Sequence, residues 1–322
     1  MNDGILLLHK PVGITSHDAV NRMRRLFGTR TVGHTGTLDP MASGLLVILI
    51  GNATKASEYA MEHDKSYRAG LFLGITTDTE DTTGKVLFES DNIPSEEEVF
   101  AVSRRFVGDI MQTPPMYSAL KVGGKKLCDL ARDGVTVERA PRPIHIYSLD
   151  IARSDERNYT LDVSCSKGTY IRTLCADIGA ALGCGGAMSS LVRTHCGGFS
   201  LDDAVTTEQL EEIDIAARQA LLRPTESLFR ELPSVRLSDF YARLARNGAE
   251  IYQRKINTSF PVGTRLRVGE TELEVTQIGK QCHNDCEIKK ATGKCVMPTE
   301  GIFAVVIKEG RIRPGDEIEV LK

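Results

Sequence analysis

Apolar and polar positions follow different patterns in successive parts of the chain, and each pattern predicts a different element. Residues 4–10 (GILLLHK) and 44–51 (GLLVILIG) are short and almost wholly apolar, which is typical of buried strands. Residues 65–75 (KSYRAGLFLGI) alternate instead, with Tyr67 and Ala69 on one side. The first part of the chain should therefore hold fully buried strands and a strand with only one buried face.

Helical periodicity accompanied by a capping signal marks further segments. Residues 16–28 (SHDAVNRMRRLFG) predict a helix, with Ser16 as the candidate N-cap and a glycine at its end. Residues 94–108 place Ser95 three positions before Glu98, which is the pattern of a capping box. Additional helices are predicted over residues 53–64, 168–182 and 237–248.

Two strand-like runs, residues 144–153 and 159–166, are close enough in the sequence to predict a hairpin. Strands and helices are mixed along the chain without a regular strand-helix-strand repeat. This mixture favours an α+β domain, with a mixed, mostly antiparallel sheet flanked by helices.

The pattern changes after about residue 230, where the chain becomes a series of short strands separated by glycines. These strands are predicted at residues 264–269, 271–279, 302–310 and 316–322. We therefore expect a larger domain over residues 1–235 and a small C-terminal β domain over residues 236–322.

Length and composition allow one large core and a second, smaller one, because the chain has 322 residues and 41% hydrophobic side chains. A formal net charge of -3 argues against a general binder of polyanions. Basic residues nevertheless outnumber acidic ones in residues 1–35 and 120–142, and a local basic face can bind phosphates. Ordinary solvated surface is the alternative interpretation.

No segment resembles a membrane span or a signal peptide. The longest apolar run is far shorter than the roughly 20 residues that cross a bilayer. Five of the eight cysteines are irregularly placed and three are clustered late in the chain, which suits reduced thiols better than a secreted disulfide framework. We expect a cytoplasmic protein, monomeric by default, that does not bind membranes.

Residues 33–46 (GHTGTLDPMASGLL) place a single carboxylate among three glycines, directly before a predicted buried strand. An Asp-Pro pair such as Asp39–Pro40 is commonly no more than a turn former. Here, glycines at positions 33, 36 and 44 would let the backbone approach a ligand, and the strand would supply a rigid, water-poor wall. Asp39 is therefore a candidate nucleophile or base.

A buried carboxylate needs an opposite charge, since burial alone raises its pKa. Arg172, near the start of a predicted helix, is the candidate partner, although it could equally be a surface or phosphate-binding residue. A flat substrate could stack on Tyr67 or Tyr170, although either could equally be an ordinary core residue.

Six segments resemble, in order and at similar spacings, the TruB family of transfer-RNA pseudouridine synthases, over about residues 3–230. They are LLLHKPVGITSHDAV, RTVGHTGTLDPMASGLLVILIGNATK, KSYRAGLFLGITTDTEDTTG, TPPMYSALKVGGKKLCDLAR, SCSKGTYIRTLCADIG and LVRTHCGGFSL. The resemblance implies the pseudouridine synthase fold and conversion of the T-loop uridine at position 55 of transfer RNA to pseudouridine.

The resemblance also implies roles for individual residues. Asp39 would be the catalytic residue, Arg172 would pair with its carboxylate, and Tyr67 would pack on the flipped base. The implied substrate-binding side chains are His34, which lies against the RNA, Tyr67, Tyr170, Leu191 and Lys10. Lys10, together with Pro11, also belongs to a motif that supports the catalytic loop.

Conversion of uridine to pseudouridine breaks the N1–C1′ bond, turns the base and rejoins it through C5, without net redox change or incorporation of water. We therefore expect no metal and no organic cofactor. The uridine must leave its stack and enter a pocket that excludes water. Asp39 could attack C1′, add to the base or abstract a sugar proton, since each route places it beside the same nucleoside. The main rival is a non-enzymatic RNA-binding module on the same scaffold.

The end of the chain departs from the RNA-contacting PUA-type domain that usually closes TruB proteins. The stretches FPVGTRLRVGETELEVTQIGKQCHNDC and CVMPTEGIFAVVIKEGRIRPGDEIEVL resemble the second half of a MOSC domain, over about residues 260–322. That resemblance implies a sulfur-carrying role for Cys282. Half a barrel cannot form the usual pocket, so a plain β appendage is an alternative. Zinc is a third, with Cys282, His283, Cys286 and Cys295 as ligands.

Overall fold

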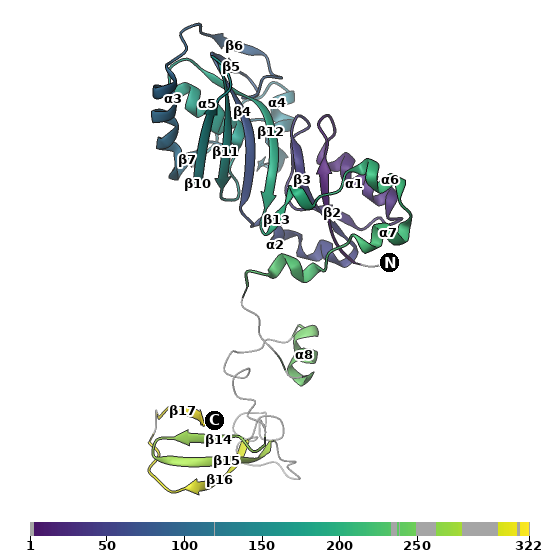
Figure 1. The fold of residues 1–322 in the computed structure, drawn as a ribbon, viewed down its shortest axis with the longest axis vertical. Coiled ribbons are helices and arrows are strands. Elements are labelled where there is room, and N and C mark those ends of the chain that lie inside the picture. The colour runs from purple at the N-terminus through teal and green to yellow at the C-terminus, as the bar shows by residue number, and fades with distance from the viewer. Residues whose placement is uncertain are drawn as a thin grey trace. The chain divides into compact units, whose positions relative to one another are not determined.

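The protein is described by a computed structural model, which covers residues 3–118, 120–232, 237, 239–248, 262–278, 302–313 and 316–321. It divides into two compact units, residues 1–232 and 233–322 (Figure 1).

A nine-stranded sheet forms the centre of the first unit, with the main order β1-β3-β12-β4-β11-β10-β7. Two short strands attach to it, β2 to β3 and β13 to β12. Only β12 and β3 pair in parallel, so the predicted mixed, mostly antiparallel sheet is confirmed. The strands are β1 (Gly4–Lys10), β2 (Val32–His34), β3 (Ser43–Ile50), β4 (Lys65–Leu73), β7 (Gly108–Gln112), β10 (Arg142–Arg153), β11 (Asn158–Cys165), β12 (Gly186–Cys196) and β13 (Phe199–Ser200).

Strand β3 is buried on both faces, which explains its unbroken apolar sequence. Leu46 and Ile48 point into one core cluster, while Leu45 and Val47 point into another on the opposite face. The second cluster is closed by Leu228 and neighbouring apolar side chains. This double burial gives the loop that precedes β3 a rigid support.

The helices of the first unit are α1 (Ser16–Leu26), α2 (Ser57–Met61), α3 (Glu96–Ser103), α4 (Leu127–Arg132), α5 (Ile171–Ala181), α6 (Thr207–Glu212) and α7 (Ile215–Ala220). Leu174 and Ile178 of helix α5 belong to the same buried core cluster as Leu71 of β4 and Leu161 of β11. Two small hairpins complete the unit: β5 (Ile75–Thr77) with β6 (Val86–Glu89), and β8 (Lys121–Val122) with β9 (Lys125–Lys126).

The helix ends follow the predicted signals with two corrections. The capping box of Ser95 and Glu98 is present at α3. At α1, the N-cap is Thr15 and not Ser16, because Thr15 forms a capping box with Asp18. Residues 53–64 do not form one helix: a 3-10 turn over Gly51–Ala56 leads into the short α2.

The second unit contains helix α8 (Asp239–Arg246) and a four-stranded antiparallel sheet in the order β16-β15-β14-β17. Its strands, β14 (Arg265–Val268), β15 (Thr271–Ile278), β16 (Ile302–Lys308) and β17 (Ile318–Leu321), lie where strands were predicted. Cys282, His283, Cys286 and Cys295 lie outside the described residues. Within the described part of the chain, every helix is too short or too polar to span a membrane.

Candidate active site

The loop between β2 and β3 carries Asp39, and hydrogen bonds fix its backbone on both sides of that residue. The Leu38 amide donates to Ser16 Oγ (2.8 Å), which donates back to the Leu38 carbonyl oxygen (3.0 Å). On the other side, the Gly13 amide donates to the Pro40 carbonyl oxygen (2.7 Å). The expected capping role of Ser16 is thus replaced by a role in holding this loop.

The structure contains the expected ion pair of Asp39 and Arg172, with 3.0 Å between Asp39 Oδ2 and Arg172 Nε. The two side chains differ in exposure: 38% of the Asp39 side chain is accessible, against 5% for Arg172. Arg172 therefore holds the carboxylate from the protein side, while the other side of Asp39 faces open space that a substrate can occupy.

Three further acceptors hold the Arg172 guanidinium in place. Nη1 donates to the Thr79 carbonyl oxygen (3.0 Å) and Nη2 to the Tyr117 carbonyl oxygen (2.7 Å). Asp81 Oδ2 lies 3.9 Å from Nη1. A cation in the first turn of α5 opposes the helix dipole, so these acceptors offset an otherwise unfavourable position.

Asp81 is a buried carboxylate that points one oxygen at Arg172. Its Oδ1 accepts from Thr79 Oγ1 (2.9 Å), the Thr83 amide (3.0 Å) and Thr83 Oγ1 (2.5 Å). These bonds leave Oδ2 free to face the guanidinium. Arg172 is consequently shared by two carboxylates, and Asp39 is the more exposed of the two.

Tyr67 and Leu191 lie on one face of the central sheet. Tyr67 of β4 is in register with Arg193 of β12 and Val163 of β11, and Leu191 is in register with Ala69 two positions further along β4. Burial raises the pKa of Tyr67 to about 12, although the charge of Arg193 and its hydrogen bond to the phenol oppose that shift. Tyr67 is therefore a neutral phenol at physiological pH.

Tyr170 is the N-cap residue of α5 and is oriented by Gln112 at the end of β7. Gln112 Nε2 donates to the Tyr170 carbonyl oxygen (3.0 Å), and Oε1 accepts from the Tyr170 amide (2.8 Å). Burial is the main cause of the raised pKa of Tyr170, and the charge of Asp39 acts in the same direction. The Tyr170 phenol thus lies near enough to Asp39 to sense its charge.

Lys10 has no exposed surface, which corrects the expectation that it binds substrate directly. Its Nζ donates to the carbonyl oxygens of Pro11 and Ile14, both at 2.8 Å. Burial lowers the pKa of Lys10 to about 8, with Asp39 opposing the shift and Arg193 adding to it. Lys10 orders the turn that also binds the loop of Asp39, as a supporting residue would.

His34 ends β2, immediately before the loop that carries Asp39, and its side chain is partly buried. Burial lowers its pKa, and the nearby charge of Arg193 lowers it further. The imidazole is consequently neutral at physiological pH, so His34 offers a substrate a hydrogen-bonding group without a charge.

Sequence reasoning missed several residues that build the site: Ser16 in its loop-holding role, Asp81, Gln112 and Arg193. Each acts on a partner that is distant in the sequence, so no local pattern marks it. Asp81 has one weak local signal, a threonine two positions away on either side. Arg193 lies inside the LVRTHCGGFSL segment, but nothing in that segment singles it out.

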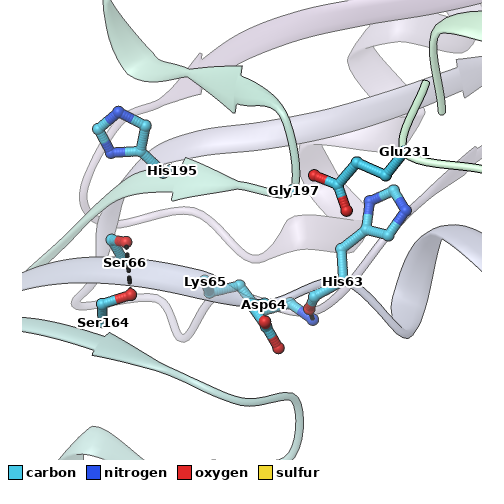
Figure 2. Close-up of a pocket in the computed structure, with 8 residues that line it drawn as sticks. All are labelled: His63, Asp64, Lys65, Ser66, Ser164, His195, Gly197 and Glu231. Carbon is cyan, nitrogen blue, oxygen red and sulfur yellow. Dashed lines mark hydrogen bonds between the residues drawn. The ribbon is translucent and has the colours of Figure 1, made fainter. Parts of the chain in front are cut away.

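A polar pocket of about 330 Å³ lies elsewhere, at the ends of β4, β11 and β12 (Figure 2). Ser66 Oγ donates to Ser164 Oγ across it (3.4 Å), and successive side chains of a strand point to opposite faces. The pocket is therefore on the face of β4 opposite Tyr67. None of the predicted site residues belongs to its lining, which is His63, Asp64, Lys65, Ser66, Ser164, His195, Gly197 and Glu231.

Two family descriptions match the first unit almost end to end. The TruB family pseudouridylate synthase (N terminal domain) matches residues 24–171. The tRNA pseudouridylate synthase B C-terminal domain matches residues 172–230. Together they cover more than half of the chain and include every predicted site residue except Lys10.

Individual relatives and solved structures agree. The chain is 44% identical over 268 residues to tRNA pseudouridine synthase B of Alkaliphilus oremlandii, covering 83% of this chain and 89% of that protein. It is 47% identical over 249 residues to the enzyme of the same name from Thiobacillus denitrificans, covering 77% and 84%. A chain in the crystal structure of a Cbf5-Nop10-Gar1 complex superposes with a TM-score of 0.60 at 28% identity, covering 77% of this chain and 68% of that one. The chain belongs to the TruB family of pseudouridylate synthases.

Proposed function

We propose that this protein isomerises uridine to pseudouridine at position 55, in the T loop of transfer RNA, with Asp39 as the catalytic carboxylate. The observation that carries the proposal is the asymmetric ion pair, in which a buried arginine holds an exposed aspartate on a rigid loop. Relatives at 44% and 47% identity are named for the same activity.

Each site residue has a separate role in the proposed reaction. Arg172 keeps Asp39 oriented, and the other carboxylate oxygen meets the nucleoside. The neutral ring of Tyr67 packs on the base while the N1–C1′ bond is broken and the C5–C1′ bond is formed, with the C5 proton lost and a proton gained at N1. Tyr170 and Leu191 close the pocket against water, which would otherwise trap the sugar. His34 lies against the RNA near the entrance.

The partner is the T stem-loop of transfer RNA, bound by one copy of the chain. Part of the basic surface is available for phosphates: Arg25, Arg30, Lys125 and Arg142 are exposed. Arg22 is not fully free, because it pairs with Glu211 at 3.7 Å. We expect affinity for the RNA to fall steeply with salt, since counterion release drives such contacts.

The C-terminal domain, residues 236–322 with its MOSC-like second half, contributes affinity for full-length transfer RNA and takes no part in the chemistry. The predicted site residues, from Lys10 to Leu191, and Arg193 all lie within the first unit. Truncation of the C-terminal domain tests this division of labour.

The test is incubation of unmodified transfer RNA with the protein, followed by mapping of pseudouridine at position 55. Asp39→Asn should lower the single-turnover rate at least about 10⁴-fold and change RNA affinity by no more than about threefold. Asp203→Asn is the matched control, because Asp203 also pairs with an arginine, Arg223, at 3.3 Å. Wild-type protein that binds transfer RNA but leaves position 55 unmodified would contradict the proposal and favour a pure RNA-binding function.

A further inference from the structure

Arg193, in the middle of β12, is one of the largest fully buried side chains of the protein, with 1% of its surface exposed. Its Nε donates to the Leu45 carbonyl oxygen (2.7 Å) and its Nη2 to the Gly36 carbonyl oxygen (3.2 Å). In the described part of the chain, no carboxylate lies within ion-pairing distance of its guanidinium. Arg193 is therefore a buried cation that is held by neutral groups.

Such a cation is costly for the fold, because the loss of hydration is not offset by an opposite charge. Its neighbours are also basic. Burial is the main cause of the lowered pKa values of Lys10, His34 and Lys65, and the positive charge of Arg193 lowers all three further. An apolar side chain could fill this part of the core without the cost of burying a charge. The arginine is therefore expected to have a further role.

The contacts of Arg193 supply that reason, since they reach three separate parts of the site. Gly36 lies in the catalytic loop, three residues before Asp39. Leu45 lies in β3, directly after the loop. Tyr67 is the register neighbour of Arg193 on β4, and its phenol accepts a hydrogen bond from the guanidinium. One side chain thus joins both ends of the loop to the aromatic ring that faces the substrate.

Two glycines, Gly44 and Gly36, lie next to Arg193 in the structure. Gly44 has a φ of +102°, and a Cβ added there would lie 2.4 Å from the Arg193 carbonyl oxygen. Gly36 has a φ of +110°, and an added Cβ would lie 3.7 Å from Arg193 Nη1. The glycine at position 44, expected to admit a ligand, instead admits the backbone of β12. The fold therefore brings β12 and the catalytic loop as close together as backbones allow.

We propose that Arg193 is a positioning residue for the isomerisation: it clamps the catalytic loop and Tyr67 into one rigid unit, so that Asp39 and the ring face the same nucleotide. The inference rests on the proposed function. Because Arg193 is buried behind both groups, it acts through them and does not touch the RNA.

Lysine and glutamine at position 193 separate this role from simple structural support. Lysine keeps the charge but cannot supply the planar fork that reaches several acceptors, and glutamine removes the charge. Both changes should lower the single-turnover rate on a T stem-loop about 100-fold, the effect expected of a small misplacement of reacting groups, with RNA affinity within about threefold of wild type. Arg218 is the matched control, because it also donates to two backbone carbonyls, those of Leu210 (2.7 Å) and Leu26 (2.8 Å). Arg218→Lys and Arg218→Gln should leave the rate within about twofold of wild type.

A double-mutant cycle tests whether Arg193 acts through Tyr67. Tyr67→Phe removes the hydroxyl that Arg193 holds, so Arg193→Gln should lower the rate less in the Tyr67→Phe protein than in wild type. If Arg193→Gln lowers the rate by the same factor in the wild-type and Tyr67→Phe proteins, Arg193 does not act through the Tyr67 hydroxyl. A wild-type rate in Arg193→Lys would overturn the positioning role. If wild-type protein itself fails to modify the RNA, the proposed function fails instead, and the two failures are distinguishable.

If the Arg193 variants do not fold, the Tyr67→Phe protein provides a second test, because it leaves Arg193 itself unchanged. In Tyr67→Phe, the nuclear magnetic resonance signal of the Arg193 Nε–H group should shift, while that of Arg218 should not. An unchanged Arg193 signal would contradict the contact on which the inference depends. In a folded Arg193→Gln protein, the pKa of His34 should rise, because the neighbouring positive charge is gone.

Discussion

Arg172 and Arg193 are both buried and both bind the machinery around Asp39, yet their surroundings differ. Arg172, at the start of a helix, faces two carboxylates, Asp39 and Asp81. Arg193, in the middle of a strand, donates to two backbone carbonyls and the Tyr67 phenol and has no carboxylate partner in the described ranges. The same residue type thus compensates charge in one place and fixes geometry in the other.

This difference predicts different responses to substitution. Where charge compensation matters, a lysine should recover part of the function, because it restores the positive charge. Where geometry matters, lysine should do little better than a neutral side chain, because it lacks the planar fork.

Removal of Arg172 should have the largest effect. Arg172→Ala leaves Asp39 and Asp81 without their shared cation, so the single-turnover rate should fall about 10³-fold, and Arg172→Lys should recover at least about tenfold of that loss. RNA affinity, measured by filter binding, should change little. If affinity and rate fall equally, Arg172 contacts a phosphate and the charge-compensation role is wrong.

Asp81, the second carboxylate that faces Arg172, provides a further test of charge compensation. Asp81→Asn keeps the shape but removes one negative charge from the guanidinium, so the rate should fall about 30-fold, equivalent to about 2 kcal/mol. Asp91→Asn is a suitable control, because Asp91 pairs with Arg157 at 2.6 Å on the surface. A rate that is unchanged in Asp81→Asn would show that Asp39 alone balances Arg172.

Truncation after residue 248 removes the four-stranded sheet of the second unit and keeps helix α8, and it tests whether the first unit is active without that sheet. Turnover of a short T stem-loop should be retained, while affinity for full-length transfer RNA should fall about tenfold through lost backbone contacts. Circular dichroism reports whether the truncated chain is folded. A folded but inactive protein would mean that the C-terminal domain completes the site.

The smallest effect concerns Asp177, a carboxylate one turn after Thr173 on α5. Burial, and then the charge of Glu80, raises the pKa of Asp177 from 3.8 to about 6. The folded state therefore binds more protons than the unfolded state between these values, and the contribution of Asp177 to stability is lost as pH rises through about 6. Asp177→Asn should raise the free energy of unfolding at pH 7 by about 1 kcal/mol and have little effect below pH 4.

Urea unfolding at the two pH values measures this effect. Asp155→Asn should respond with the opposite sign, because hydrogen bonds from the backbone amides of Arg157 and Asn158 lower the pKa of Asp155. Equal responses of the two variants would show that burial of the Asp177 carboxylate carries no penalty at pH 7.

The parts of the fold that depend on neighbours in sequence were predictable. The capping box of Ser95 and Glu98, the hairpin of β10 and β11, and the alternation of β4 each follow from residues a few positions apart. The choice of Thr15 over Ser16 as N-cap was not predictable in this way, because the hydroxyl of Ser16 is already engaged by Leu38.

The site was predictable only where a motif carried it. Arg172 was one candidate partner of Asp39 from the residues alone, the family resemblance singled out the pair, and the structure supplies its distance and its asymmetry. The role inferred for Arg193 depends on β12 lying between β3 and β4, an order that brings residue 193 beside both Gly44 and Tyr67. No spacing in the sequence encodes that order.

We expect Asp39 and Tyr67 to face one nucleoside, and a structure of the protein with a T stem-loop carrying 5-fluorouridine at position 55 tests this claim. We predict that the modified nucleoside lies between the Asp39 carboxylate and the Tyr67 ring, with the pair of Asp39 and Arg172 intact. A nucleoside bound in the pocket of His63 and His195, on the opposite face of β4, would contradict the claim.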